Sequence, residues 1–448
     1  MRFWRRTSEI LGFSRVPNRD PELLEKGWWH SFEFPSGERV DGVRSTQGLN
    51  RQLARFHVPN DLSGKRVLDI GAWDGWFSFE MERRGADVLA VDSWDNPRFR
   101  YAHTQFNSRV HYCVEDLYDL TPRKIGHFDI VLFFGGLYHL KHPVLALEKV
   151  CALTRDVAYV ESHVIDRGLR SALRATRAVM EFYETNELAG RADNWIGPNS
   201  RCLLALCRVA GFARARLESV AEHRAYVTCY RAWDCPEGGY SGSAPTLIKA
   251  IHNRDRGINF CSSRDEYISC WFRTAQRNLR REDVRPIVGA WGATPLSLEP
   301  RGGDVWQANF KLPPGLDSGF HDVKVGISQG AFSNACRIAV DVAPVTDSLV
   351  VTGLCDGRTW KPDEVRLQPD GIIAVWVAGL PYNADLNNTE VILGGRRLAV
   401  EHVAAPEAGQ PTQVNARVPA DFPVGQHSVQ VRVANTVSAP IDLMVVVR

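Results

Sequence analysis

The sequence lacks the features that mark metal-binding and disulfide-stabilised proteins. Its ten cysteines are scattered through 448 residues, with no CxxC pair and no tight cluster of cysteine and histidine. A zinc site is therefore not expected. Disulfide frameworks belong to much shorter, cysteine-dense secreted chains. We expect free, mostly buried thiols in a reducing compartment, and no bound metal.

The chain also lacks a long hydrophobic run. No apolar stretch approaches the length needed to cross a bilayer, so we expect no membrane partner. The first residues, MRFWRRTSEILGF, carry basic side chains but no sustained apolar region and no small-residue cleavage site. We do not interpret them as a signal peptide. The expected location is cytoplasmic.

A strong imbalance of charge is absent as well. The formal net charge is +2 and the calculated isoelectric point is near 8.0. Proteins that hold RNA mainly through its phosphates usually show a stronger basic bias, so an RNA partner is neither demanded nor excluded. The arginines near the amino terminus, Arg2, Arg5 and Arg6, fit a solvated end better than a binding patch.

The length predicts two to four domains. Residues 1–60 are interpreted as an N-terminal helical and aromatic cap. In residues 61–235, short apolar runs alternate with helical segments, which is typical of a parallel sheet covered on both faces. The predicted strands are 67–70, 87–91, 109–114, 129–134 and 157–161, and the predicted helices are 75–84, 143–153 and 200–210. Two further β-like runs, 215–220 and 224–231, complete this α/β domain.

The last 200 residues contain an internal repeat after a predicted linker at 236–243. The segment WQANFKLPPGLDSGFHDVKV (306–325) matches TQVNARVPADFPVGQHSVQV (412–431) at a constant offset. We predict two Ig-like β-sandwich domains, 244–343 and 347–448. Trp271 and Trp376 are expected in the two cores. His321 and His427 precede equivalent strands, where a structural role is favoured over a functional one.

The stretch VLDIGAWDGW (67–76) raises the first functional question. A buried strand runs into Gly71-Ala72-Trp73-Asp74-Gly75, and a helix follows. A dinucleotide site would need GxGxxG with a phosphate at the helix end. Here the glycines are spaced GxxxG, and Asp69 and Asp74 would repel a phosphate. The carboxylates suit a cationic ligand such as S-adenosylmethionine (SAM), although an isolated GxxxG is more often an ordinary turn.

The ends of the next strands carry matching polar groups. Asp92 and Ser93 end the second strand, and a carboxylate there can accept hydrogen bonds from both ribose hydroxyls. Glu115 and Asp116 end the third strand, where a side chain can receive an adenine amino group. Gly135 and Gly136 end the fourth strand. Since open α/β sheets bind ligands at these ends, the ordered set predicts a SAM site. Asp92 alone would be equally consistent with a helix cap.

These residues resemble a known family. VLDIGAWDGWFSFEMERRGADVLAVD is similar to the SAM-binding start of class I methyltransferases. The segment FDIVLFFGGLYHLKHPVLALEKVCALTRDVAYVESHVID (128–166), above all GGLYHLKHP, resembles the tRNA wobble-uridine methyltransferases and their relatives of unknown substrate. The resemblance covers roughly residues 27–235. It implies a Rossmann-like class I fold and methyl transfer from SAM to a small-molecule or RNA acceptor.

The resemblance also implies roles for individual residues. Asp69, Gly71 and Gly75 would line the methionine end of SAM, while Asp92 would hold the ribose and Glu115 the adenine edge. Gly136, Tyr138 and His139 would face the methyl group. His139 could act as general base because its pKa lies near neutrality, and Tyr138 could shape the methyl pocket. The alternative for His139 is a packing or capping role in its loop.

The chain departs from the family in two places. The carboxy-SAM enzymes carry a lysine before the sheet, whereas residues 29–35 (WHSFEFP) contain none, which favours ordinary SAM. The aromatic residues of this region could form a lid over the acceptor, but core contacts are favoured. The duplicated β-domain is foreign to the tRNA enzymes. A non-catalytic SAM-binding protein, or a binding protein that takes a protein or glycan partner through the β-sandwiches, therefore stays open as an alternative.

Overall fold

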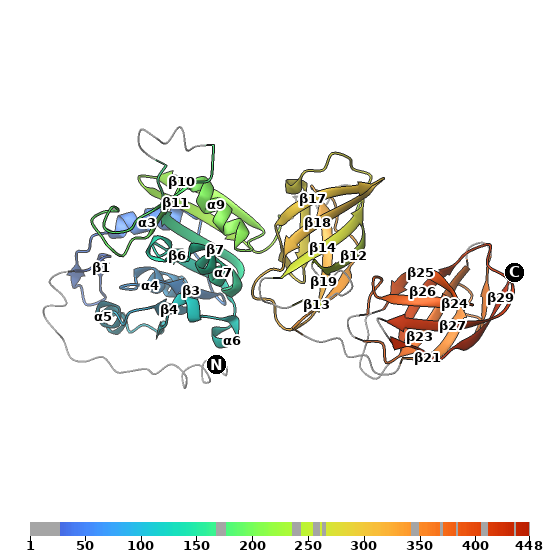
Figure 1. Ribbon diagram of the computed structural model, residues 1–448. Coiled ribbons are helices and arrows are strands. Elements are labelled where there is room, and N and C mark those ends of the chain that lie inside the picture. Colours follow the sequence, from blue (N-terminus) through green and yellow to red (C-terminus); the bar gives the residue numbers. More distant parts are fainter. Residues whose placement is uncertain are drawn as a thin grey trace. The chain divides into compact units, whose positions relative to one another are not determined.

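The computed structural model describes residues 27–166, 176–234, 243–253, 260–261, 266–341, 349–367, 371–381, 384–404, 411–433 and 436–447. The arginines near the amino terminus and nearly all of the predicted linker lie outside the described residues. The chain divides after Asp234 into an α/β unit and a β unit (Figure 1). Among the described residues, none of the helices combines the length and the apolar character needed to span a membrane.

The α/β unit is built on a seven-stranded sheet. Its order is β10-β11-β7-β6-β3-β4-β5. The strands are β3 (Arg66–Ile70), β4 (Asp87–Asp92), β5 (His111–Val114), β6 (Phe128–Phe134), β7 (Thr154–His163), β10 (Arg214–Ala221) and β11 (Arg224–Tyr230). The strands β3 to β7 are mutually parallel, whereas β11 and β10 add to the edge in antiparallel fashion. The predicted strands are all present.

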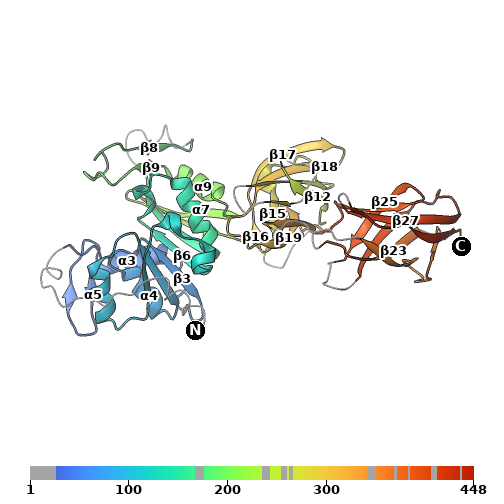
Figure 2. The same ribbon diagram turned by 60° about the horizontal axis from the view of Figure 1, so that its bottom comes forward.

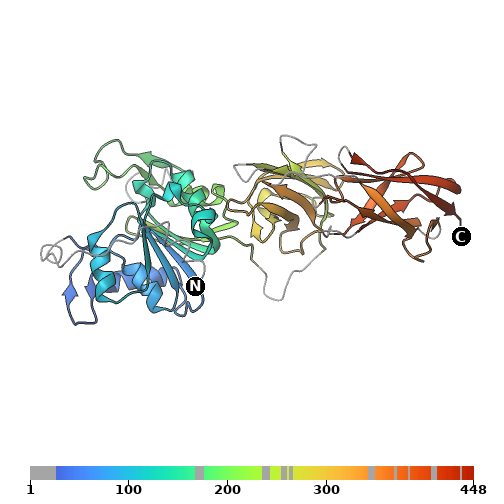
Figure 3. The ribbon, with the colours of Figure 1, turned by 90° about the horizontal axis from the view of Figure 1, so that it is seen from below.

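Helices cover both faces of this sheet, which explains the uninterrupted apolar strands. One face carries α3 (Thr46–Arg55), α4 (Trp76–Arg83) and α5 (Pro97–Gln105), and the other carries α7 (Pro143–Leu153) and α9 (Ser200–Val209) (Figures 2 and 3). Six of the seven residues of β6 are buried, as expected for a strand between two helix layers. The smaller elements are α6 (Pro122–Ile125), η1 (Leu117–Asp119), η2 (Leu137–His139) and the hairpin β8 (Met180–Phe182) with β9 (Ile196–Pro198).

The N-terminal cap differs from the prediction of helix and loop. Its described part, from residue 27, contains a short hairpin, β1 (Phe32–Glu33) and β2 (Arg39–Val40), before α3. Trp28, Phe32 and Phe34 are buried in the core of the adjacent helix face, where Phe32 and Phe34 stack 5.6 Å apart. The favoured expectation of core contacts is thus confirmed for these three rings, whereas it is wrong for Trp29, which is exposed.

The β unit contains two hydrophobic cores, one for each repeat. The first is enclosed by two sheets, β12-β14-β18-β17 and β13-β20-β19-β15-β16. These strands are β12 (Thr246–His252), β13 (Phe260–Cys261), β14 (Tyr267–Arg273), β15 (Val284–Val288), β16 (Trp291–Gly292), β17 (Pro295–Gly302), β18 (Val305–Lys311), β19 (Gly319–Ile327) and β20 (Cys336–Val340), with the turn η3 (Arg281–Asp283). This layering is consistent with a β-sandwich.

The second repeat has the sheet order β21-β23-β26-β25-β24-β27-β29-β22. Its strands are β21 (Val350–Asp356), β22 (Glu364–Arg366), β23 (Gly371–Ala378), β24 (Thr389–Leu393), β25 (Arg396–Val403), β26 (Thr412–Val418), β27 (Gly425–Val433), β28 (Thr436–Val437) and β29 (Ile441–Val446). In both repeats a short early strand pairs in parallel with the last long strand, β13 with β20 and β22 with β29.

Equivalent side chains make equivalent bonds in the two repeats. Gln307 donates to Asn309 at 2.9 Å, and Gln413 donates to Asn415 at the same distance. The Nε2 atoms of His321 and His427 each lie 2.9 Å from the carbonyl four residues earlier. These contacts support the structural role expected for the two histidines.

The prediction that the paired tryptophans lie in the cores is wrong. Trp271 and Trp376 are partly exposed, whereas the neighbouring positions along each strand are buried. Successive side chains of a strand point to opposite faces. Ile268, Cys270 and Phe272 occupy the inner face of β14, so Trp271 lies on the outer face, where the Lys249 ammonium lies 4.2 Å from its ring.

Candidate active site

The candidate site lies where the sheet changes its direction of winding. From β3 the chain proceeds to β4 and β5 on one side, and it returns to β6 and β7 on the other. The loops after β3 and β6 therefore diverge, and ligands of open α/β sheets bind at such a point. The loop after β3 is Gly71–Gly75, hereafter the cofactor loop. The loop after β6 begins at Gly135 and Gly136.

The conformation of the cofactor loop explains its glycines. Gly71 and Gly75 have φ angles of 74° and 92°, in the left-handed region that glycine tolerates. A Cβ on Gly75 would lie 2.6–2.7 Å from the rings of Phe79 and Phe99, whereas a Cβ on Gly71 would have no heavy atom within 4 Å. The space in front of Gly71 is thus open, which fits close approach of a ligand. Trp73 also has positive φ, at 54°, and such values are unusual for a bulky residue.

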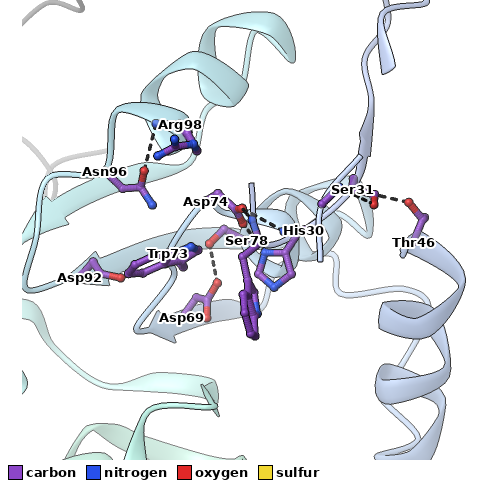
Figure 4. A network of polar contacts seen from close by, with 12 residues as sticks. His30, Ser31, Thr46, Asp69, Trp73, Asp74, Ser78, Asp92, Asn96 and Arg98 are labelled. Atoms are coloured by element: carbon purple, nitrogen blue, oxygen red, sulfur yellow. Dashed lines mark hydrogen bonds and ion pairs between the residues drawn. The ribbon is translucent and has the colours of Figure 1, made fainter. Parts of the chain in front are cut away.

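Asp69 and Asp92 lie at the ends of neighbouring strands and are both buried, with exposed fractions of 2% and 8%. Burial raises the pKa of Asp69 to about 6, although the hydroxyl of Ser78 donates to its carboxylate at 2.6 Å (Figure 4). Burial also raises the pKa of Asp92. A cationic ligand would offset this cost of burying carboxylates.

The Asp92 carboxylate retains capacity for a further hydrogen bond. One oxygen accepts from the backbone N–H of Trp73 at 2.9 Å, and the other accepts from that of Trp94 at 3.3 Å. The backbone N–H of Ser93 also bonds to this carboxylate. A carboxylate offers about four acceptor positions, so one remains for a hydroxyl group such as that of a ribose. Ser93 is exposed beside it. The backbone amides of Gly71 and Ala72 both donate to the carbonyl of Val91, at 2.8 and 3.2 Å, which fixes the cofactor loop against β4.

Of the two acidic residues at the end of the third strand, one is a candidate cofactor contact and the other caps a 3-10 helix. Glu115 is partly exposed, and Lys124 Nζ lies 3.7 Å from its carboxylate. Asp116 instead caps η1, because its carboxylate accepts from the backbone N–H of Tyr118 at 2.8 Å. Asp74 differs from the other predicted residues, since its fully buried carboxylate accepts hydrogen bonds from the N-terminal segment at Trp29 and His30.

The loop after β6 gathers a polar cluster in which the predicted Tyr138 meets two residues that were not predicted, Glu161 and Arg224. Gly135 has a φ of 71°, and a Cβ there would lie 3.6 Å from the Tyr138 hydroxyl and 3.8 Å from Glu161 Oε2. Arg224 Nη1 donates to the Tyr138 hydroxyl at 3.0 Å and lies 3.3 Å from Glu161 Oε1. Burial raises the pKa of both Tyr138 and Glu161.

His139 is held by a neighbouring loop. Its Nδ1 lies 3.0 Å from the carbonyl oxygen of Asp193 and 3.5 Å from the Asp193 carboxylate. A carbonyl only accepts, so Nδ1 carries the hydrogen, and Nε2 of the neutral ring carries a lone pair. Burial lowers the pKa of His139, which keeps the ring neutral near pH 7. This is the form that a general base requires.

Sequence reasoning missed several residues of this region. Glu161 stands at the carboxyl end of the fifth parallel strand, so the rule that located Asp92 could have located it too. Arg224 lies in an antiparallel strand and Asp193 in a loop. No motif in the sequence around either residue predicts that it belongs to the site. Across the described residues, no group of three or more His, Cys, Asp and Glu side chains could hold a metal ion.

Part of the α/β unit is similar in sequence to known methyltransferases. Residues 44–201 match a family described as a methyltransferase domain. A ubiquinone biosynthesis O-methyltransferase of Acinetobacter baylyi is 29% identical over 159 residues, which is 34% of this chain and 63% of that protein. A tRNA U34 carboxymethyltransferase of Azotobacter vinelandii is 31% identical over 173 residues, 36% of this chain and 49% of that protein. The chain thus spans between about half and two thirds of these relatives' lengths.

Among solved structures, the N-terminal domain of EvdMO1 with S-adenosylhomocysteine (SAH) bound superimposes with a TM-score of 0.37 and 20% identity. The superimposed region covers 51% of this chain and 95% of the EvdMO1 chain. Residues 44–201 of the α/β unit are therefore similar to methyltransferase domains, and the order of its parallel strands is that of a Rossmann-like fold.

Proposed function

We propose that the protein transfers a methyl group from SAM to an acceptor held beside Tyr138 and His139. The proposal rests on the residues found where neighbouring parallel strands of the sheet end. Asp69, Gly71 and Asp92 lie at adjacent strand ends, with open space in front of Gly71 and unused acceptor capacity on Asp92. The set matches a nucleoside that bears positive charge and no phosphate.

Each strand end is assigned a part of the cofactor. The carboxylates of Asp69 and Asp92 complement the charged methionine end and the ribose. Gly71 and Ala72 allow the backbone to approach. We propose that Glu115 lies along the adenine edge with Ser93, and that Asp116 shapes this loop through its cap of η1. Gly135 keeps the space beside the Tyr138 hydroxyl free of a side chain, whereas Gly136 is needed for close packing against the ring of Phe133.

For the proposed reaction, the protein mainly has to align the acceptor with the methyl group of SAM and to supply a base for the proton of the acceptor. SAM supplies a methyl carbon whose bond to sulfur breaks as its bond to the acceptor forms. His139 Nε2 takes the proton that the acceptor releases, while Asp193 holds the ring through Nδ1. The Tyr138 hydroxyl, bonded to Arg224, is placed to orient the acceptor. Positional control of this kind is worth several kcal/mol of the barrier, on the order of 7–11 in favourable cases.

A tRNA wobble uridine is a second candidate acceptor. The similarity to a tRNA U34 carboxymethyltransferase favours it. The segment Trp29–Pro35 contains no lysine, and for that reason we propose ordinary SAM as donor in either case. For the β unit, we propose that each repeat is an Ig-like sandwich, since two sheets enclose one core in the first repeat and its contacts recur in the second. Binding of a protein or glycan partner there stays a prediction.

Titration calorimetry of the full chain with SAH and with NAD tests the cofactor assignment. We expect SAH to bind in the micromolar range and NAD not to bind. Asp92→Ala should weaken SAH at least tenfold, because the buried ribose hydroxyls would lose a charged acceptor. Binding of NAD in place of SAH would contradict the proposal. Incubation with radiolabelled SAM and total tRNA, compared with a small-molecule extract, then separates the two acceptor classes.

A further inference from the structure

Asp74 links the cofactor loop to the N-terminal segment. Its carboxylate is fully buried and accepts from the backbone N–H groups of Trp29 at 2.8 Å and His30 at 3.0 Å. The Nδ1 atom of His30 lies against the other oxygen of the same carboxylate (Figure 4). Because a carboxylate only accepts, Nδ1 is the donor. Three hydrogen bonds from two adjacent residues thus converge on one loop side chain.

Asp74 lies between two residues that set the conformation of the cofactor loop, so this contact can affect the candidate site. Trp73 directly precedes it, and the backbone N–H of Trp73 is one of the donors that hold the Asp92 carboxylate. Gly75 follows it and begins the turn into α4. His30 is itself 6% exposed, and its ring packs edge-on against Phe77, 5.5 Å away. The imidazole is therefore fixed from both sides.

The N-terminal segment also reaches the other half of the site. Arg44 donates its backbone N–H to the carbonyl of Trp29 at 2.7 Å, so the two ends of residues 28–44 lie side by side. The Arg44 guanidinium donates to Gln52 at 3.0 Å, and its charge lowers the pKa of Glu161, which burial raises. The segment thus lies against the cofactor loop, and the charge of Arg44 acts on the buried Glu161 carboxylate.

We propose that His30 is a positioning residue that, through Asp74, holds the cofactor loop in its SAM-binding conformation. The inference rests on the proposed function and gives residues 28–44 the role of a strap across the loop. It also assigns Asp74 to the strap, in place of the direct cofactor contact that the sequence pattern predicts. Formation of the His30–Asp74 contact and binding of the cofactor are then coupled, and such coupling is reciprocal.

The test compares variants that remove or restore a single donor. His30→Phe keeps an aromatic ring against Phe77 but removes the hydrogen bond to Asp74. His30→Asn places an amide N–H near the position of Nδ1. Tyr101→Phe is the matched control, because the Tyr101 hydroxyl donates to the Glu38 carboxylate, at 3.1 and 3.0 Å, and anchors the same segment away from the cofactor loop. Each variant is titrated with SAH and melted without ligand.

We expect His30→Phe to weaken SAH binding tenfold or more, His30→Asn to recover it to within threefold, and Tyr101→Phe to leave it within twofold. Asp74→Asn should resemble His30→Phe, since an amide nitrogen cannot accept. If His30→Phe binds SAH like the parent while Asp74→Asn does not, Asp74 contacts the cofactor directly and the strap is wrong. Equal losses in His30→Phe and Tyr101→Phe would also contradict it.

Hydrogen exchange without ligand separates this inference from the proposed function. The amides of Gly71, Trp73 and Gly75 are all hydrogen-bonded. We expect them to exchange at least tenfold faster in His30→Phe, and at the parental rate in Tyr101→Phe, even if SAH does not bind to any variant. Unchanged exchange in His30→Phe would overturn the positioning role. Absence of SAH binding by the parent would overturn the proposed function alone.

Discussion

Burial dominates the energetics of the carboxylates at the strand ends. Asp69 is the clearest example, since it is 2% exposed and burial raises its pKa although the hydroxyl and the backbone N–H of Ser78 both donate to it. Burial of an ionised carboxylate without full compensation destabilises the folded state. A residue of this kind is better explained by the ligand that it would meet than by the stability of the empty protein.

The first prediction concerns this residue. The pKa of Asp69 is raised from its ordinary value to about 6 by burial. The folded protein therefore keeps a proton that the unfolded chain releases, so this stabilising contribution is present at low pH and lost as the pH rises through 6. Asp69→Asn should gain about 2 kcal/mol in unfolding free energy relative to the parent between pH 4.5 and 7.5. Urea unfolding at both pH values measures this.

The exposed Asp61 provides the control. Its pKa is lowered by a hydrogen bond with Ser63 rather than raised by burial. Asp61→Asn should therefore show no relative gain as the pH rises. A flat difference between Asp69→Asn and the parent would show that Asp69 ionises at its ordinary pKa, and the electrostatic argument for a cationic ligand would lose its main support.

The second prediction concerns the proposed base. His139→Gln should lower kcat by a factor on the order of 10²–10⁴ while SAH affinity changes less than threefold, since the imidazole acts on the acceptor proton. Burial lowers the pKa of His139, so the parental rate should fall only when the pH drops below the ordinary value of a histidine. Steady-state kinetics across pH 5–8 checks both points. Parental turnover in His139→Gln would leave His139 a packing role.

At the scale of elements, the turn between β3 and α4 has two requirements. It must leave space for a ligand on one side and pack closely against the core on the other. Gly71 faces open space, while Gly75 faces the rings of Phe79 and Phe99. The same short turn therefore has one glycine that a ligand would need and one that packing needs. The spacing of the two glycines is therefore explained by the geometry of this turn, without the phosphate that a GxGxxG turn binds.

The third prediction separates backbone strain from packing at this turn. Gly75→Ala would place Cβ 2.6 Å from Phe79 in a backbone with φ at 92°. Left-handed strain costs about 1–2 kcal/mol, and overpacking adds roughly 1–3 kcal/mol. Gly64→Ala is the matched control, because its φ is 75° but a Cβ there meets no atom within 4 Å. Chemical unfolding should show a clearly larger loss for Gly75→Ala, and equal losses would contradict the packing argument.

At the scale of the whole molecule, duplication left two β-repeats with matching contacts and separate cores. The parallel pairing of β13 with β20 recurs in β22 with β29. The Nδ1 atoms of His321 and His427 would lie 3.1 and 2.9 Å from a Cβ on Gly289 and Gly394 respectively. A turn glycine and a strand-entry histidine have therefore been retained together in each copy.

The fourth prediction follows from this equivalence. His321→Ala and His427→Ala each remove one hydrogen bond to a loop carbonyl. Each should lower the unfolding free energy of the β unit by about 1 kcal/mol, and the losses should add in the double variant, since the two cores are separate. Calorimetry of the three variants measures this. A much larger loss in one repeat would show that the two histidines are not equivalent.

The sequence by itself determined the order of the α/β elements, the strand-end motif and the repeat, because apolar periodicity and glycine spacing are local signals. Only the tertiary structure decided where partners from distant segments meet. His30 reaches Asp74 across 44 positions, and Arg224 reaches Tyr138 across 86. The outward direction of Trp271 likewise depended on which face of β14 met the core. Local sequence carries backbone preference, whereas side-chain partnership depends on the packing of the whole chain.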